Sequence, residues 1–161
     1  MLDLSGTVHV DDKLLPGVKE AVSILKEQKV PIQYVTNTSK ENLTSLGDRV
    51  RRAGLDIKDE EIFSSLTAAR DLVQTEGLRP LMLLEESAVK QFEGIDCRDP
   101  NCVLVGLSPS SFHYEKLNEA FKLGINLTHS KNDANNQVLQ FSYERRQVDS
   151  CQQVKIFSEG L

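Results

Sequence analysis

Stretches of strand length and stretches with helical spacing alternate along this chain, and that alternation restricts the possible folds more than any other feature. After Pro16 and Gly17, which are placed to start a helix, apolar residues recur at helical spacing: Val18, Ala21, Val22 and Leu25. Residues 30–35 have the composition of a strand, and a second helical pattern follows at Leu43, Leu46, Val50 and Ala53. A repeated strand, loop, helix order favours a parallel β-sheet covered by helices, so we expect an α/β fold.

A second α/β unit is expected after the first. Past Gly77, strand-like runs alternate with helical patterns in the order strand 80–84, helix 88–92, strand 103–107, helix 114–121 and strand candidate 125–127. From Ser130 the chain turns polar, and the short apolar runs that follow have neither spacing. The sequence therefore predicts three parts: a first unit at residues 1–69, a second at 70–127, and a divergent, poorly ordered tail at 128–161.

The 161-residue chain has a formal net charge of −5, which argues against nonspecific binding to nucleic acid or anionic membranes, since both select for excess Lys and Arg. It contains no run of about 18 apolar residues and no basic N-terminal segment followed by an apolar one, so we expect neither a membrane span nor a secretory signal. The three cysteines, Cys97, Cys102 and Cys151, are odd in number and lack metal-ligand spacing, which predicts free thiols in a reducing compartment. We accordingly expect a cytoplasmic protein that binds neither nucleic acid nor membrane.

The segment Asp3-Leu4-Ser5-Gly6-Thr7 lies where the first expected strand meets a loop, and open α/β sheets bind ligands at such carboxyl ends. A carboxylate there can attack phosphorus or hold a metal ion, and Gly6 would let the loop backbone approach a phosphate closely. The same residue types also suit a strand end followed by an Asx or Ser turn. Taken alone, these five residues fit the turn better than the binding site.

A second polar loop, Thr36-Asn37-Thr38-Ser39, follows the strand expected at 30–35 and precedes the next helix. Hydroxyl and N–H groups at a helix N-terminus suit an anion, although simple capping by Ser39 or Thr38 explains the same residues equally well. Two polar loops at the carboxyl ends of neighbouring strands would set a carboxylate opposite a phosphate cradle. That arrangement fits phosphoryl transfer to an aspartate and hydrolysis of the covalent intermediate by water.

The remaining polar residues carry weaker signals. His9 lies just past the first loop and is expected to be an ordinary loop residue, while His113 and His129 have no partners at metal-ligand spacing. A group of basic residues is expected to form a solvated helical face without a role: Lys40, Arg49, Arg51 and Arg52.

The segment from Asp3 to Thr7, followed by the apolar Val8, resembles the first motif of the haloacid dehalogenase superfamily, an Asp-x-Asp-x-Thr pattern. Leu15-Pro16-Gly17 and the strand ending in Val35-Thr36-Asn37-Thr38 are similar to members that carry a large α/β cap inserted after the second motif. The resemblance runs from Leu2 to about Gly124. It implies a partial core with a Rossmann-like parallel sheet, followed by a second α/β cap domain.

This resemblance implies a Mg²⁺-dependent phosphohydrolase that acts on a small phosphorylated molecule through an aspartyl-phosphate. Asp3 would be the nucleophile and a Mg²⁺ ligand, and the backbone carbonyl of Ser5 would be a second ligand. The phosphate would be held by four residues: Gly6, Thr7, Thr36 and Asn37. The cap residues would shape the substrate pocket and exclude water.

The chain departs from the family pattern in ways that affect catalysis. Ser5 stands where most members have a second Asp, the general acid that protonates the leaving group and then activates water. General acid–base help is worth about 10²- to 10⁴-fold in rate, so we expect slow turnover. The Lys of the third motif and the acidic residues of the fourth have no convincing match, and Met1 begins almost at the nucleophile. We therefore expect a truncated and impaired member; the alternative is a non-catalytic pseudoenzyme or truncated isoform that binds phosphate or a partner.

A clipped central strand predicts low stability, because such a strand is buried on both faces and an incomplete sheet exposes apolar edges. We expect the isolated chain to be marginally stable or to associate as a homo-oligomer. Thermal unfolding followed by circular dichroism, with the mass in solution measured by light scattering, tests this expectation. A cooperative transition of a monomer above about 60 °C, high in the range of mesophilic domains, would contradict it.

Overall fold

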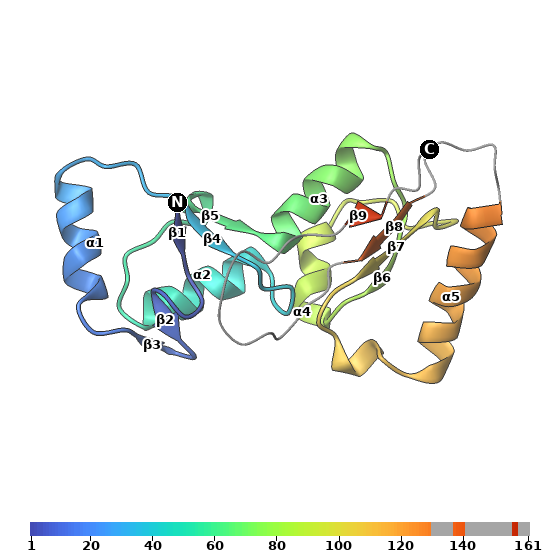
Figure 1. Ribbon diagram of the computed structural model, residues 1–161, viewed down its shortest axis with the longest axis horizontal. Helices are drawn as coiled ribbons and strands as arrows, with labels where there is room; N and C mark the ends of the chain where they lie inside the picture. The colour runs from blue at the N-terminus through green and yellow to red at the C-terminus, as the bar shows by residue number, and fades with distance from the viewer. Residues whose placement is uncertain (130–136, 141–155, 158–161) are drawn as a thin grey trace.

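The computed structural model describes residues 1–129, 137–140 and 156–157 and places most of its strands in two sheets (Figure 1). The first sheet consists of three parallel strands in the order β1-β4-β5: β1 (Leu2–Asp3), β4 (Tyr34–Thr36) and β5 (Ile62–Ser64). The chain crosses from β1 to β4 through α1 (Val18–Glu27), and from β4 to β5 through α2 (Leu43–Arg52) and the 3-10 turn η1 (Asp59–Glu61). A separate antiparallel hairpin of β2 (His9–Val10) and β3 (Lys13–Leu14) follows β1.

The second sheet has the strand order β6-β7-β8-β9. Its strands β6 (Pro80–Leu83), β7 (Cys102–Val105) and β8 (Gln137–Gln140) are parallel, and β9 (Ile156–Phe157) is antiparallel to β8. Helix α3 (Ser65–Thr75) leads from β5 to β6. The helices between the strands of the second sheet are α4 (Glu86–Val89) and η2 (Lys90–Phe92), between β6 and β7, and η3 (Pro109–Ser111) and α5 (Tyr114–His129), between β7 and β8. Figure 1 shows α3 and α5 on opposite sides of this sheet. Parallel strands joined through helices confirm the expected α/β class.

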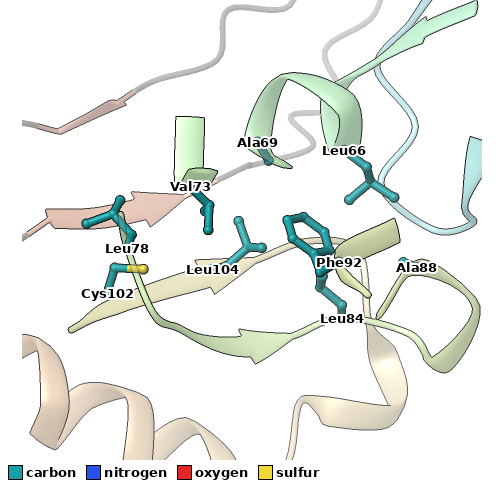
Figure 2. Close-up of a cluster of buried hydrophobic side chains, with 9 residues drawn as sticks. All are labelled: Leu66, Ala69, Val73, Leu78, Leu84, Ala88, Phe92, Cys102 and Leu104. Carbon is teal, nitrogen blue, oxygen red and sulfur yellow. The ribbon is translucent and has the colours of Figure 1, made fainter. Parts of the chain in front are cut away.

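Each sheet has its own buried core. The first core contains the fully buried Leu4, Tyr34 and Leu46. In the second, Leu66 and Ala69 of α3 cluster with other apolar residues from α3 to β7: Val73, Leu78, Leu84, Ala88, Phe92, Cys102 and Leu104 (Figure 2).

The predicted boundary between residues 69 and 70 lies inside α3, and the first turn of that helix already packs with the second sheet. We therefore propose that the two domains divide before Ser65. Most of the predicted tail at 128–161 lies outside the described residues. Its described segments are the end of α5 and the strands β8 and β9.

Two expectations about individual elements are wrong. Residues 125–127, expected as a strand, continue α5. The apolar residues Leu117, Phe121 and Ile125 recur every four positions there, and one glycine inside a helix costs only about 1 kcal/mol relative to alanine. The strand expected at 30–35 begins only at Tyr34, so Pro31 lies before it.

Apolar side chains of α5 reach the surface, because Tyr114, Leu117, Phe121 and Ile125 are all exposed. Within the described part of the chain, no helix has the length and apolar character needed to cross a membrane. The thiols of Cys97 and Cys102 are both free, as expected, whereas Cys151 lies outside the described residues. Burial raises the pKa of the Cys102 thiol to about 12, which keeps it protonated at neutral pH.

Replacing Phe92 with alanine tests the core of the second sheet. The side chain is 2% exposed and its loss leaves a cavity, so we expect the free energy of unfolding to fall by about 3–5 kcal/mol. Phe121→Ala makes the same chemical change on a side chain that is 65% exposed, where the expected effect is within about 0.5 kcal/mol. Urea unfolding of the two variants beside the parent measures both values, and similar losses in the two would contradict the placement of Phe92.

Candidate functional site

Pairing between β1 and β4 brings the two polar loops of the sequence together. Leu2 N–H donates to the Gln33 carbonyl (2.8 Å) and Leu4 N–H donates to the Val35 carbonyl (2.9 Å). Because the strands are parallel, with Asp3 opposite Val35, both loops leave the sheet at the same edge. Asp3 is exposed at that edge, whereas the neighbouring Thr36 is 6% exposed.

The loop after β1 is a tight turn held by its own backbone. The N–H groups of Val8 and His9 both donate to the Leu4 carbonyl, at 3.0 and 3.1 Å, and Gly6 N–H donates to the His9 carbonyl at 2.8 Å. Gly6 has a φ of +91°, and a Cβ added there would meet nothing within 4 Å. The backbone conformation rather than lack of space therefore requires glycine. Its N–H group, which a phosphate nest would use, is engaged within the turn.

Hydroxyl groups link this turn to the nucleophile candidate and to the next strand. Thr7 Oγ1 donates to Asp3 Oδ2 at 3.1 Å. Ser5 Oγ lies 3.4 Å from Thr36 Oγ1, which also accepts from Thr38 N–H at 3.4 Å. The structure thus brings together four of the predicted site residues, and the fifth and sixth, Gly6 and Asn37, lie on the same two loops.

The predicted helix start next to Thr36 is wrong. Helix α2 begins at Leu43, and its N-cap is Asn42, whose Oδ1 accepts from Ser45 N–H at 2.8 Å. Ser39, the expected cap, uses its Oγ elsewhere: it accepts a hydrogen bond from the N–H of Leu107, 68 positions along the chain, at 2.9 Å. An anion at Thr36 would therefore meet loop backbone and side chains instead of a helix N-terminus.

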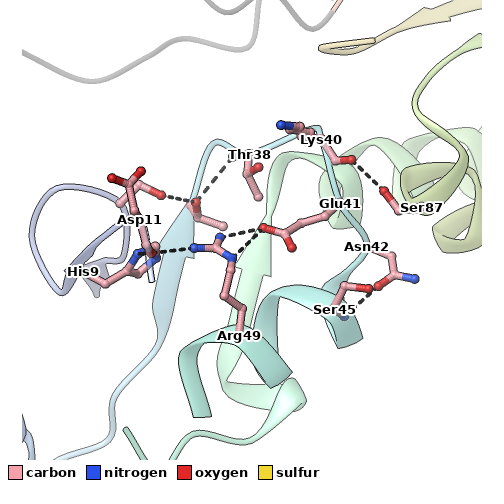
Figure 3. A network of polar contacts seen from close by, with 11 residues as sticks. His9, Asp11, Thr38, Lys40, Glu41, Asn42, Ser45, Arg49 and Ser87 are labelled. Carbon is pink, nitrogen blue, oxygen red and sulfur yellow. Dashed lines mark hydrogen bonds and ion pairs between the residues drawn. The ribbon is translucent and has the colours of Figure 1, made fainter. Parts of the chain in front are cut away.

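The loop at residues 37–42 is also where the second unit contacts the first. Ser87 Oγ donates to the Lys40 carbonyl (2.9 Å, Figure 3), and Gln91 Oε1 accepts from Leu43 N–H (3.0 Å). Around the Ser39 contact the fit is close: a Cβ on Gly106 would lie 3.1 Å from Ser39 Cβ. The second unit is therefore held directly against the candidate phosphate loop.

A guanidinium group joins this loop to the hairpin, a role that the expectation of a solvated basic face missed. Arg49 binds Glu41 Oε1 through Nη2 (2.6 Å) and Nε (3.2 Å), and its Nη1 donates to the Asp11 carbonyl (2.9 Å, Figure 3). His9 Nδ1 donates to the same carbonyl at 2.9 Å. Asp11 has a φ of +50°, so these two donors hold a residue whose backbone is in the left-handed region.

His9 is not the ordinary loop residue expected, because its ring is 4% exposed. Its Nε2 is buried and has no hydrogen-bond partner among the described residues.

A hydrogen-bonded carboxylate lies in the second unit. Glu85 accepts from the backbone N–H (3.2 Å) and the hydroxyl (2.9 Å) of Ser110, in the linker after β7. These hydrogen bonds lower the pKa of Glu85 and join the linker after β7 to the segment that follows β6.

The oxygen ligands that the site offers suit a hard cation that also binds a phosphate. Across the described residues there is no cluster of three or more His, Cys, Asp or Glu side chains that could hold a metal. Mg²⁺ commonly takes one or two carboxylates, substrate phosphate oxygens and several waters. The exposed Asp3 carboxylate and the Ser5 backbone carbonyl fit that smaller requirement.

Arg49→Lys tests the link between the hairpin and the loop. Lysine keeps the charge but has no planar fork to reach Glu41 and the Asp11 carbonyl at once. We expect the amides of β2 and β3 to exchange hydrogen about 10-fold faster, as loss of one charged hydrogen bond predicts. The matched control is Arg52→Lys on the same helix, where Nε contacts only the Asp48 carbonyl among the described partners. Exchange measured by mass spectrometry that is equal in both variants would contradict the link.

This chain is similar in sequence to known hydrolases. Residues 1–98 match the haloacid dehalogenase-like hydrolase family. Over 123 residues the chain is 46% identical to human haloacid dehalogenase-like hydrolase domain-containing protein 2, and the alignment covers 76% of this chain and 48% of that protein. The chain thus spans about half the length of the curated relatives it matches.

Solved structures show the same fold. A 4-nitrophenylphosphatase from Thermotoga maritima superposes with a TM-score of 0.69 at 29% identity, over 81% of this chain and 51% of that one. Glycerol phosphate phosphatase from Mycobacterium tuberculosis, in complex with magnesium, gives a TM-score of 0.67 at 19% identity, over 81% and 40% of the two chains. With its family match extending over more than half of its length, this chain belongs to the haloacid dehalogenase-like hydrolases.

Proposed function

We propose that this chain carries the nucleophile and phosphate-binding half of a Mg²⁺-dependent phosphatase that acts on a small phosphorylated molecule. The observation that carries the proposal is the exposed Asp3 carboxylate at the end of β1, beside Thr36 at the end of β4. Support also comes from the related structure at 29% identity, which is a 4-nitrophenylphosphatase.

In the proposed reaction, Asp3 attacks phosphorus and forms an aspartyl-phosphate that water then hydrolyses. The Thr7 hydroxyl, bonded to Asp3 Oδ2, orients the carboxylate and leaves its other oxygen for attack. Thr36 and Asn37 would hold the phosphate oxygens, and Thr7 lies at the same edge. Mg²⁺ bound by Asp3 and the Ser5 carbonyl would offset charge on the phosphate. The magnesium and calcium complexes of the glycerol phosphate phosphatase support a divalent cation in this role.

The second unit would act as the cap over this site. Support for this role comes from its three hydrogen bonds to the segment 39–43, which hold it beside the proposed phosphate loop. We also propose a reducing, cytoplasmic location, for which the free thiols of Cys97 and Cys102 are the support.

A second candidate function is a non-catalytic module that binds phosphate or a partner chain. It is favoured by the side chains on the two loops, because Ser5, Thr7 and Thr36 supply hydroxyls and Asp3 is the one carboxylate among the six predicted site residues. Such a module predicts anion binding without turnover. Phosphate binding that survives Asp3→Asn, with no hydrolysis by the parent chain, would establish this function instead.

Asp3→Asn tests the proposed nucleophile, with hydrolysis of 4-nitrophenyl phosphate in the presence of Mg²⁺ as the measurement. We expect hydrolysis to fall to the uncatalysed background, because an amide cannot form the aspartyl-phosphate. Removing Mg²⁺ with a chelator should have the same effect on the parent chain. Asp12→Asn, at an exposed carboxylate of the hairpin, is the matched control and should leave the rate within about two-fold. Turnover that persists in Asp3→Asn would contradict the proposal.

A further inference from the structure

We propose that Ser5 restricts this site to phosphoryl donors whose leaving group departs as a stable anion, such as aryl phosphates and acyl phosphates, and excludes alkyl phosphates. The inference rests on the proposed function, in which Asp3 is the nucleophile. It concerns which bond to phosphorus the site can break, and it follows from the chemical nature of the groups around Asp3.

Each side-chain hydrogen bond described between residues of the site involves a hydroxyl group. Ser5 Oγ is 3.4 Å from Thr36 Oγ1, and Thr7 Oγ1 donates to Asp3 Oδ2 at 3.1 Å. An alcohol neither gives nor takes a proton readily at neutral pH, unlike the His, Glu, Asp or Lys side chains that serve as general acids and bases. Asp3 itself is used as the nucleophile, so its carboxylate cannot also protonate the leaving group.

The nearest titratable residues of the hairpin, His9 and Asp11, hydrogen-bond to each other, and Asp11 also accepts from Arg49. His9 is 4% exposed and spends its Nδ1 proton on the Asp11 carbonyl, so its ring is part of the packed hairpin. Asp11 meets its described partners through that carbonyl, which also accepts from Arg49, and Figure 3 shows both contacts. Neither residue has a hydrogen bond to Ser5, Thr7 or Thr36 among those of the described residues.

The first step shows why the leaving group matters. A carboxylate oxygen of Asp3 forms a bond to phosphorus while the bond from phosphorus to the leaving oxygen breaks, and its electron pair stays on that oxygen. A nitrophenolate or a carboxylate is stable in water with this negative charge. An alkoxide is not, and it must receive a proton as it departs. With a hydroxyl at Ser5, a nitrophenolate or carboxylate can still depart without a proton donor. An alkoxide cannot, because the proton that it needs is not supplied.

The second step is slow for either donor. Water attacks the phosphorus of the aspartyl-phosphate, the bond from phosphorus to the Asp3 oxygen breaks, and its electron pair returns to the carboxylate. The proton that water loses must pass to the solvent, because the Ser5 hydroxyl is a poor base. The phosphorylated chain should therefore accumulate with an aryl phosphate, and the first turnover should release nitrophenolate faster than all later ones.

The experiment follows the 161-residue chain in Mg²⁺ with 4-nitrophenyl phosphate, acetyl phosphate and, as the alkyl ester, glycerol phosphate. Rapid mixing records nitrophenolate, a phosphate assay records hydrolysis, and intact mass records phosphorylation of the chain. We expect a burst approaching one nitrophenolate per chain, a mass gain of one phosphoryl group with both anionic leaving groups, and turnover of the alkyl ester slower by about 10²- to 10⁴-fold.

Two substitutions identify Ser5 as the cause. Ser5→Asp supplies a carboxyl group. The ratio of the aryl ester's turnover rate to that of the alkyl ester should fall by about 10²-fold or more, and the burst of nitrophenolate should disappear. Ser5→Ala removes the hydroxyl without adding an acid and should leave the ratio as it is. An unchanged ratio in Ser5→Asp would overturn the inference.

Two further outcomes separate this inference from the function beneath it. Hydrolysis of alkyl and aryl esters at similar rates by the parent chain would overturn the leaving-group restriction and leave the phosphatase proposal standing. Asp11→Asn would then show whether the hairpin carboxylate is the acid. Absence of both phosphate release and mass gain with every donor, relative to Asp3→Asn, would overturn the proposed function and this inference together.

Discussion

Two backbone hydrogen bonds, from Leu2 to Gln33 and from Leu4 to Val35, place the Asp3 carboxylate beside Thr36, and every chemical role proposed for the chain depends on them. β1 has only two residues, so its register depends on β4 and on the buried Leu4 that follows it. A slip of one residue would exchange the faces of the strand and turn Asp3 away from the edge where Thr36 lies. The site is thus a product of sheet pairing before it is a product of its side chains.

The loop at residues 37–42 connects three parts of the molecule. Arg49 ties it to the hairpin through Glu41, and Ser39 and Lys40 tie it to the second unit. Since its backbone is held from two sides, the loop can present Thr36 and Asn37 in a defined geometry without the support of an adjacent helix. Such preorganisation would lower the conformational entropy that the loop loses when it binds the proposed phosphate.

Periodicity and residue type predict the parts of this fold that local sequence controls. The alternation of apolar patterns predicts the parallel sheets, and the positions of Asp3 and Thr36 at strand ends predict that they meet. The roles of Ser39 and Arg49 were not predictable, because their partners lie 68 and 38 positions away. The sequence predicts Ser39 as a helix cap, but its hydroxyl accepts from Leu107 N–H. Asn42 caps the helix instead.

The close approach of Gly106 to Ser39 has an evolutionary consequence. A Cβ at residue 106 would lie 2.6 Å from Leu84 Cδ2 and 3.1 Å from Ser39 Cβ, so a larger residue there needs compensation at both neighbours. Substitutions at these three positions should therefore covary among relatives, even though two of them lie in the second unit and one in the loop at residues 37–42. The lack of a Cβ at Gly106, in the second unit, in this way limits which residues can replace Ser39 in the first.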